Sequence, residues 1–228
     1  ENDLWVIARG TEPTSFDDWM TDLKFRESNI KQVRFHQGFH NSAQALLNSI
    51  VNGKKLIELI EELSKKKRKI YFAGHSLGGA LAIYFSWYLT KNYDHKGNEK
   101  SPIIPKDKVF TYTFGAPNVG NKELSNEIDS HTYRIVYNQD IVARIPNFLN
   151  YKPAGKLFYI KEDGEITNPS DIPDIDELII HNIFEFKNNP DIGVLLKFGV
   201  FTPFVKLFLN HSMEYYCYFL KKELDRGK

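Results

Sequence analysis

Cysteine is almost absent from this sequence: Cys217 is the only one among 228 residues, which excludes a disulfide within the chain. Secreted eukaryotic enzymes usually carry disulfides, so we expect a cytoplasmic or a bacterial protein. Uninterrupted apolar runs of about eighteen residues, which a membrane-spanning helix needs, are also lacking. No signal peptide is visible, but Glu1 stands almost at the start of a predicted strand, and we expect an upstream segment to be missing.

An excess of charge of either sign is lacking as well. The chain has 30 Lys and Arg against 29 Asp and Glu, so its composition gives no reason to expect a nucleic-acid partner. No Cys and His cluster has metal-ligand spacing, and we expect neither a metal nor an organic cofactor. One basic run, 65–69, is typical of a solvated helix end, with contact to anionic lipid headgroups as the alternative. Nothing in the sequence indicates the oligomeric state.

The most informative segment that is present is the pentapeptide Gly-His-Ser-Leu-Gly at 74–78. It follows an apolar β-type run, 70–73, and precedes a helix-type run, 81–89. A serine on such a tight strand-to-helix turn adopts a strained backbone, and the flanking glycines let the strand and the helix approach each other. Its Oγ then lies above the sheet, next to the N–H groups of a helix N-terminus. This pattern is typical of an α/β-hydrolase and predicts Ser76 as a nucleophile.

The apolar pattern around this turn predicts one α/β domain over 1–228. Strands alternate with helical stretches, which favours a mostly parallel sheet flanked by helices, and no Gly-, Ser- or Pro-rich linker divides the chain. We expect a local irregularity at Gly53 and a hairpin turn at Asp163 and Gly164. The predicted strands are 4–8, 33–36, 70–73, 109–114 and 133–137, the helices are 41–63, 123–128 and 212–224, and the hairpin spans 156–166.

A nucleophilic serine needs a histidine base, and the histidine needs a carboxylate that orients it. In an α/β-hydrolase this carboxylate comes after the serine in the sequence, and functional residues of such sheets lie beyond the carboxyl ends of strands. Asp140 fits this position, because it follows the predicted strand 133–137 closely. Asp129 precedes the same strand, at its wrong end. Three further candidates lie in a proline-containing loop, where solvated charge is the simpler interpretation: Asp171, Asp174 and Asp176.

Two histidines follow Asp140, and either could supply the base. His211 stands at a loop-to-helix junction, from which an imidazole reaches over Ser76 more readily than from within an apolar run. His181 is the alternative, although its position inside the apolar stretch 178–184 suits a half-buried structural imidazole. The earlier histidines have structural contexts, and His75, inside the pentapeptide, is expected to pack beside the site.

An acyl-transfer site also needs two hydrogen-bond donors for the oxyanion that develops on the substrate. One is predicted to be the backbone N–H of Leu77, directly after the nucleophile. The other is expected from the loop after an earlier strand. There Gly10 allows a tight turn, and Thr11 offers both its N–H and its hydroxyl.

Together these residues resemble the class 3 lipases, a family of α/β-hydrolases that includes fungal triacylglycerol lipases and many bacterial and plant relatives. The resemblance covers most of the chain, from about Leu4 to Phe219. It implies the triad Ser76, Asp140 and His211, with Thr11 and Leu77 as the oxyanion hole. It rests on motifs at 8–11 (Ala-Arg-Gly-Thr), 18–23 (Asp-Trp-Met-Thr-Asp-Leu), 36–39 (His-Gln-Gly-Phe), 74–80, 114–117 with 119–121, 138–140 (Asn-Gln-Asp), and His211 with Tyr215.

In this family a short helical lid follows the Arg-Gly-Ser/Thr turn and covers the serine until a lipid surface opens it. The resemblance therefore implies a lid at 12–22, with Phe16, Trp19 and Met20 on its apolar face. The alternative for Trp19 is that it packs in the core. The lid residues and His75 are the expected contacts of the substrate.

Two features depart from the family pattern. The usual N-terminal family segment, a helix and strands, is missing before residue 4. An apolar insertion, 168–209, also precedes His211, and its last part, 193–209, is too short and too broken by Pro203 to span a bilayer. This part is interpreted as a buried segment beside the acyl pocket, with docking on a membrane as the alternative.

The resemblance implies a serine carboxylic-ester hydrolase that cleaves acyl esters of lipids, that is, a lipase acting on triacylglycerol or another acylglycerol. Phospholipase A1 or lysophospholipase activity is the alternative within the family. A catalytically silent lipid-binding module is the alternative from a different class of protein. The expected partners are a lipid ester and, peripherally, a lipid interface or membrane.

Overall fold

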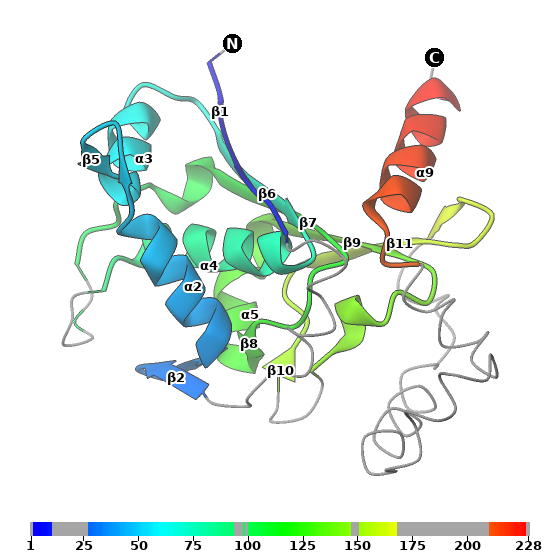
Figure 1. Ribbon diagram of the computed structural model, residues 1–228, viewed down its shortest axis with the longest axis horizontal. Helices are drawn as coiled ribbons and strands as arrows, with labels where there is room; N and C mark the ends of the chain where they lie inside the picture. The colour runs from blue at the N-terminus through cyan, green and yellow to red at the C-terminus, as the bar shows by residue number, and fades with distance from the viewer. Residues whose placement is uncertain are drawn as a thin grey trace.

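The computed structural model describes residues 2–10, 27–93, 98, 100–146, 151–167 and 210–226. Its centre is a six-stranded sheet with the order β1-β6-β7-β9-β11-β12, in which only the last pair is antiparallel (Figure 1). This arrangement confirms the prediction of a mostly parallel sheet. The strands are β1 (Leu4–Ala8), β6 (Ile70–His75), β7 (Val109–Phe114), β9 (Thr132–Tyr137), β11 (Lys156–Ile160) and β12 (Ile166–Thr167).

One face of this sheet carries the main core. It is covered by α2 (Gln37–Leu47), α4 (Leu77–Lys91) and α5 (Lys122–Ile128), which pack together with a small second sheet. The second sheet has the order β10-β8-β3-β2, formed by β10 (Tyr151–Lys152), β8 (Gly120–Asn121), β3 (Val33–His36) and β2 (Glu27–Ile30). Helix α4 is buried along nearly its whole length, because its residues are apolar on all sides. It therefore fixes the strand-to-helix turn at its start.

The prediction of one helix over 41–63 is wrong. Helix α2 ends at Leu47, a two-stranded hairpin of β4 (Ile50–Val51) and β5 (Lys54–Lys55) follows, and α3 covers Leu56–Ser64. Asn52 and Gly53, with φ values of 52° and 77°, form the hairpin turn. Asn-Gly favours this positive-φ turn, which outweighs the helical spacing of the apolar residues on either side. Gly53 is therefore a turn residue and not a helix irregularity.

The remaining predicted elements are present. The loop after β11 turns at Gly164, with φ of 92°, into β12, which confirms the hairpin. The C-terminal helix α9 covers Met213–Arg226, close to its predicted bounds. Three short 3-10 turns complete the described chain: η1 (Lys106–Lys108), η2 (Asp129–His131) and η3 (Val142–Arg144). None of the described helices is both long and apolar enough to cross a membrane.

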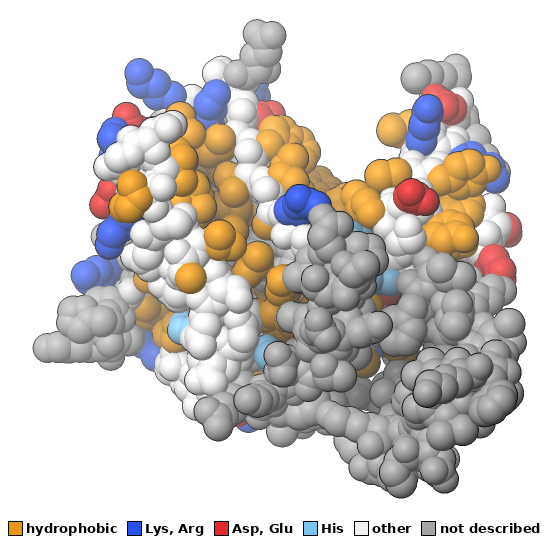
Figure 2. Space-filling model, viewed as in Figure 1, with side chains coloured by type: hydrophobic (Ala, Val, Ile, Leu, Met, Phe, Trp, Pro, Cys, Tyr) orange, Lys and Arg blue, Asp and Glu red, His pale blue; other side chains and the backbone are white. Residues whose placement is uncertain are grey.

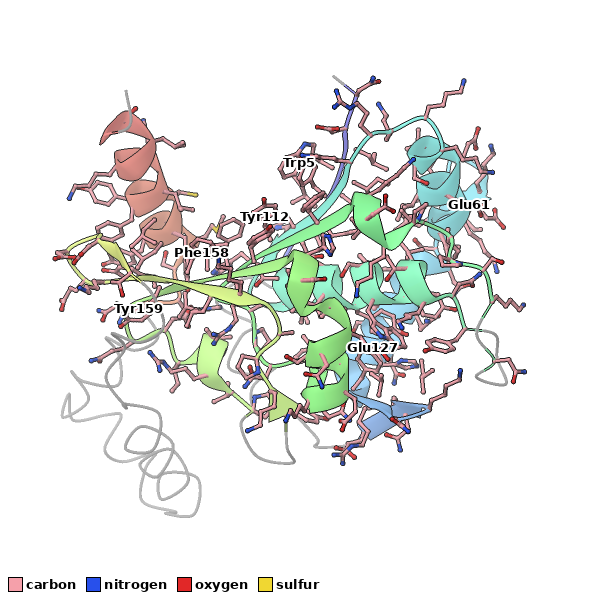
Figure 3. The ribbon with its side chains drawn as sticks, turned by 180° about the vertical axis from the view of Figure 1, so that it is seen from behind. Trp5, Glu61, Tyr112, Glu127, Phe158 and Tyr159 are labelled. Atoms are coloured by element: carbon pink, nitrogen blue, oxygen red, sulfur yellow. The ribbon has the colours of Figure 1, made fainter. Side chains whose placement is uncertain are left out.

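The second face of the central sheet is rich in aromatic rings. Trp5 stacks on Tyr71 with ring centroids 4.2 Å apart, and Tyr112 stacks on Tyr133 at 4.9 Å. Figure 3 shows Trp5, Tyr112 and Phe158 on this same side of the sheet. Helix α9 packs on the part of this face nearest the carboxyl ends of β9 and β11. Figure 2 shows the molecule hollowed between β1 and α9, with hydrophobic side chains on both sides of the hollow.

Candidate active site

The turn between β6 and α4 holds Ser76 in the conformation expected of an activated serine. Its φ and ψ are 57° and −129°, a strained backbone for a residue with a side chain. A Cβ at Gly74 would collide with the backbone of Gly78, and one at Gly78 with the carbonyl of Ala8, so only glycines allow this close approach. The N–H of Ser76 donates to the carbonyl of Phe114 at 3.0 Å, which ties the turn to the end of β7. The predicted elbow is therefore present at Ser76.

Asp140 lies beyond the carboxyl end of β9, on the turn that begins at Asn138. This asparagine has φ of 43°, and the N–H of Asp140 donates to the carbonyl of Tyr137 at 3.0 Å, which closes the turn. The carboxylate of Asp140 is completely buried, and the N–H of Val142 donates to its Oδ1 at 2.9 Å. A buried carboxylate needs such donors, because it has lost its hydration.

His211 reaches this carboxylate from the segment just before α9. Its Nδ1 lies 2.9 Å from Oδ2 and 3.0 Å from Oδ1 of Asp140, although the two residues are 71 positions apart in the sequence. A carboxylate only accepts hydrogen bonds, so Nδ1 carries the proton. The structure thus brings His211 and Asp140 together. His181 and the alternatives Asp171, Asp174 and Asp176 lie outside the described residues, and Asp129 stands before β9, in η2.

Tyr216 is a member of the site that the sequence analysis missed. Its hydroxyl donates to Oδ2 of Asp140 at 2.5 Å and accepts from the N–H of Tyr137 at 3.0 Å. Burial, and then the adjacent Asp140 carboxylate, raise the pKa of Tyr216 well above its usual value, so the phenol keeps its proton. The family motif pairs His211 with Tyr215, but the ring of Tyr215 is exposed and stacks on Tyr137. The sequence did contain a signal for Tyr216, because Tyr216 and Phe219 have the helical spacing of a buried face.

Gly115 explains how these side chains fit together at the end of β7. Its φ is 57°, and a Cβ built there would lie 3.0 Å from Nδ1 of His211 and 2.9 Å from the hydroxyl of Tyr216. The same Cβ would come closer still to Oδ2 of Asp140. The motif at 114–117 is one of those that carry the resemblance to the class 3 lipases. In the structure its glycine leaves room for the carboxylate of Asp140, the imidazole of His211 and the phenol of Tyr216 to meet.

His75 lies beside the site, as expected. Its Nε2 is 2.7 Å from the backbone carbonyl oxygen of His211, and the two imidazole rings stack with centroids 4.5 Å apart. Burial, and then the neighbouring His211, lower the pKa of His75 to about 4. The ring is therefore neutral at neutral pH.

Of the two predicted oxyanion donors, Leu77 is among the described residues and Thr11 is not. Leu77 is the first residue of α4, so its N–H stands at the N-terminus of a long buried helix. A Cβ built on Gly10 would lie 3.4 Å from Cβ of Ser76 and 2.7 Å from the carbonyl oxygen of His75, which brings the end of β1 against the elbow. Thr11, the residue after Gly10, lies outside the described residues, as do the lid at 12–22 with Phe16, Trp19 and Met20, and the insertion at 168–209.

Within the described ranges no three His, Cys, Asp or Glu side chains form a metal-binding group.

The model of the family described as lipase (class 3) matches residues 5–150, more than half of the chain. The chain belongs to the class 3 lipase family. It is 30% identical over 217 residues to triacylglycerol lipase OBL1 of Arabidopsis thaliana, covering 76% of this chain and 40% of that protein. It is also 36% identical over 108 residues to the chloroplastic phospholipase A1-Igamma1 of the same plant, covering 46% of this chain and 20% of that protein.

A solved lipase structure has the same fold. The lipase of Rhizomucor miehei, in its propeptide complex, superimposes with a TM-score of 0.57 at 25% identity, covering 73% of this chain and 51% of that chain. The similarity confirms the α/β-hydrolase fold that the elbow predicted. The present chain spans less than half the length of the Arabidopsis lipase.

Proposed function

We propose that this chain is a serine carboxylic-ester hydrolase that cleaves acyl esters of lipids, with triacylglycerol or another acylglycerol as substrate. The observation that carries the proposal is the contact of His211 Nδ1 with the buried Asp140 carboxylate at 2.9 Å. His211 also contacts His75, which directly precedes the serine in the strained elbow. An imidazole held in this way is the general base that a serine nucleophile needs. Family membership supports the choice of lipid esters as the substrate class.

In the proposed first half-reaction, Oγ of Ser76 attacks the ester carbonyl carbon and its proton passes to Nε2 of His211. The carbon–Oγ bond forms as the carbonyl π electrons move onto oxygen, which becomes an oxyanion. Asp140 keeps Nδ1 protonated and stabilises the imidazolium. The N–H of Leu77, together with the N–H and hydroxyl of Thr11, are the proposed oxyanion donors.

Collapse of this intermediate restores the carbonyl and breaks the bond to the alcohol, which leaves with the proton from Nε2. An acyl-enzyme on Ser76 remains. In the second half-reaction a water molecule gives a proton to Nε2 of His211 and attacks the acyl carbon. Oγ then leaves with that proton, and the carboxylic acid is released. Neither half-reaction needs a metal or an organic cofactor.

The test is hydrolysis of p-nitrophenyl esters of increasing acyl length by the chain and by its Ser76→Ala variant. We expect longer acyl chains to be preferred and the variant to lose about 10⁴-fold or more in kcat. Ser86→Ala is the matched control, because Ser86 is a buried serine on α4, the helix that follows Ser76, where its Oγ donates to the carbonyl of Ile83 at 3.0 Å. Equal activity of Ser76→Ala and the unchanged chain would overturn the proposal.

Phospholipase A1 or lysophospholipase activity is the second candidate, because the similarity to the chloroplastic phospholipase A1-Igamma1 is higher in identity although shorter. Comparing fatty-acid release from triacylglycerol emulsions with release from phosphatidylcholine vesicles separates the two substrates. Binding to lipid micelles without hydrolysis of any ester would indicate a silent lipid-binding module.

Two segments are proposed to contact a lipid interface: the lid at 12–22 and the apolar stretch at 193–209. Both lie outside the described residues, so this proposal rests on the sequence alone. If 193–209 docks on membranes, replacing Phe201, Phe204 and Phe208 with serine abolishes liposome binding and spares hydrolysis of a soluble short ester. Unchanged liposome binding would leave this stretch as a segment flanking the acyl pocket.

A further inference from the structure

His75 makes two separate contacts with His211, from the position directly before Ser76. One is the 2.7 Å contact of its Nε2 with the backbone carbonyl oxygen of His211, and the other is ring stacking at 4.5 Å with an interplanar angle of 28°. The ring of Tyr216 also contacts that of His75 in an edge-to-face arrangement, with centroids 5.7 Å apart and an interplanar angle of 64°. The His75 ring thus contacts two side chains that both contact Asp140.

The direction of the hydrogen bond defines the protonation of this ring. A backbone carbonyl only accepts, so Nε2 of His75 is the donor and carries the proton. A neutral imidazole has a single N–H, and Nδ1 is therefore unprotonated. The titratable groups that face the ring are His211, Asp140 and Tyr216. Burial and the neighbouring imidazole keep the ring neutral, with its pKa lowered to about 4, so this arrangement holds at neutral pH.

These contacts address a problem of the proposed mechanism: the base comes from a segment 136 residues away from the elbow. Asp140 contacts only the edge of the His211 imidazole, at Nδ1, and leaves the tilt of the ring and the position of its backbone to other groups. The hydrogen bond from His75 holds the backbone, and the stacked ring limits the tilt. Because His75 is covalently bonded to Ser76, both contacts fix the position of His211 relative to the nucleophile.

We propose that His75 is a positioning residue, which holds the backbone and the ring of His211 in register with Ser76. The inference rests on the proposed function, in which His211 is the base for Ser76. Misplacing a catalytic group by about 1 Å costs on the order of 100-fold in rate. Loss of one of several restraints is therefore expected to lower kcat by about tenfold. KM is expected to change less than twofold, because His75 acts through the base and not through the substrate.

The experiment compares His75→Phe with His75→Gln, using a soluble short-chain p-nitrophenyl ester. Phenylalanine keeps a stacking ring and removes the donor, whereas glutamine keeps an N–H donor near the Nε2 position and removes the ring. We expect His75→Phe to lose about tenfold in kcat and His75→Gln to retain kcat within about threefold of the unchanged chain. Recovery by the donor-retaining variant is a result that a merely space-filling residue would not give.

His40→Phe is the matched control for loss of a half-buried histidine contact. His40 has its Nδ1 3.0 Å from the hydroxyl of Tyr84, in the core around α2 and α4. Its replacement is expected to lower the melting temperature and to leave kcat unchanged. The inference is overturned if His75→Phe keeps kcat within twofold, or if His75→Phe and His75→Gln lose equal activity. If the unchanged chain has no activity that Ser76→Ala removes, the proposed function itself fails, which is a different result.

Discussion

The hydroxyl of Tyr216 donates a 2.5 Å hydrogen bond to Oδ2 of Asp140 in a fully buried setting, 76 residues away in the sequence. The same hydroxyl accepts the N–H of Tyr137, so the phenol links the end of β9 to the carboxylate that follows it. Asp140 therefore has donors from His211, Val142 and Tyr216 around it. A carboxylate with this many donors is held in one orientation toward the imidazole.

Tyr216→Phe is predicted to lower both activity and stability. It removes a hydrogen bond to a charged group and leaves the N–H of Tyr137 without this acceptor, which costs about 1–3 kcal/mol of unfolding free energy. We expect kcat to fall about tenfold, because Asp140 is then less well oriented. Denaturant unfolding and ester hydrolysis measure the two effects. Tyr215→Phe is the control, since Tyr215 is 41% exposed, and an equal loss in both variants would contradict the prediction.

Gly115→Ala is predicted to disrupt the site through a single methyl group. The added Cβ would enter the space between Asp140, His211 and Tyr216 and would also occupy a positive-φ position. Gly53→Ala is the matched control, because Gly53 also has positive φ but nothing lies within 4 Å of its Cβ position. We expect both variants to lose about 1–2 kcal/mol from backbone strain, and Gly115→Ala alone to lose most of its ester hydrolysis. Comparable activity in the two variants would contradict this account of Gly115.

The buried His36 is predicted to make stability depend on pH. Burial lowers its pKa, and neither ring nitrogen has a hydrogen-bond partner within the described part of the chain. The folded state then binds fewer protons than the unfolded state below about pH 6.5, so stability falls as pH decreases from there. His36→Phe should therefore show a smaller drop in melting temperature between pH 7.5 and pH 5. Each kcal/mol corresponds to about 2–4 °C in a chain of this size.

The control for this effect is His131→Gln, because the Nδ1 of His131 lies 2.8 Å from the hydroxyl oxygen of Ser130 and so has a partner among the described residues that the ring of His36 lacks. The comparison shows whether the loss of any histidine gives the same change as His36→Phe. His75 contributes in the same direction as His36, since its pKa is also lowered, to about 4. Some pH dependence therefore remains in His36→Phe, and a profile identical to that of the unchanged chain would argue against the role of His36.

The two faces of the central sheet are predicted to respond differently to truncation. Phe72 is completely buried on the face covered by α4, whereas Trp5, on the neighbouring strand and the opposite face, is 55% exposed. Phe72→Ala should cost about 3–5 kcal/mol through lost burial and the cavity left behind. Trp5→Ala should cost about 0.5–1.5 kcal/mol, mainly the stacking on Tyr71. Denaturant unfolding of the two variants measures the difference, and equal costs would mean that both faces are core.

Much of the fold could be predicted because its signals are local. The alternating pattern at 109–114 and the turn at Asp163 and Gly164 depend on neighbouring residues, and both are found in the structure. The prediction of a single helix over 41–63 was wrong, and the reason is also local. Apolar spacing on both sides of Asn52 and Gly53 favoured a helix, but the turn preference of these two residues decided the backbone.

The sequence by itself determined the elbow at Ser76 and the position of Asp140. The elbow follows from two glycines spaced around Ser76 between an apolar strand and an apolar helix. The position of Asp140 follows from its place just beyond the carboxyl end of a strand. Only the tertiary structure decided which side chains meet there: His211 and Tyr216 on Asp140, and His75 stacked on the imidazole of His211. Side chains separated by 71 to 136 residues leave no periodic pattern, because their meeting depends on how α9 packs on the sheet.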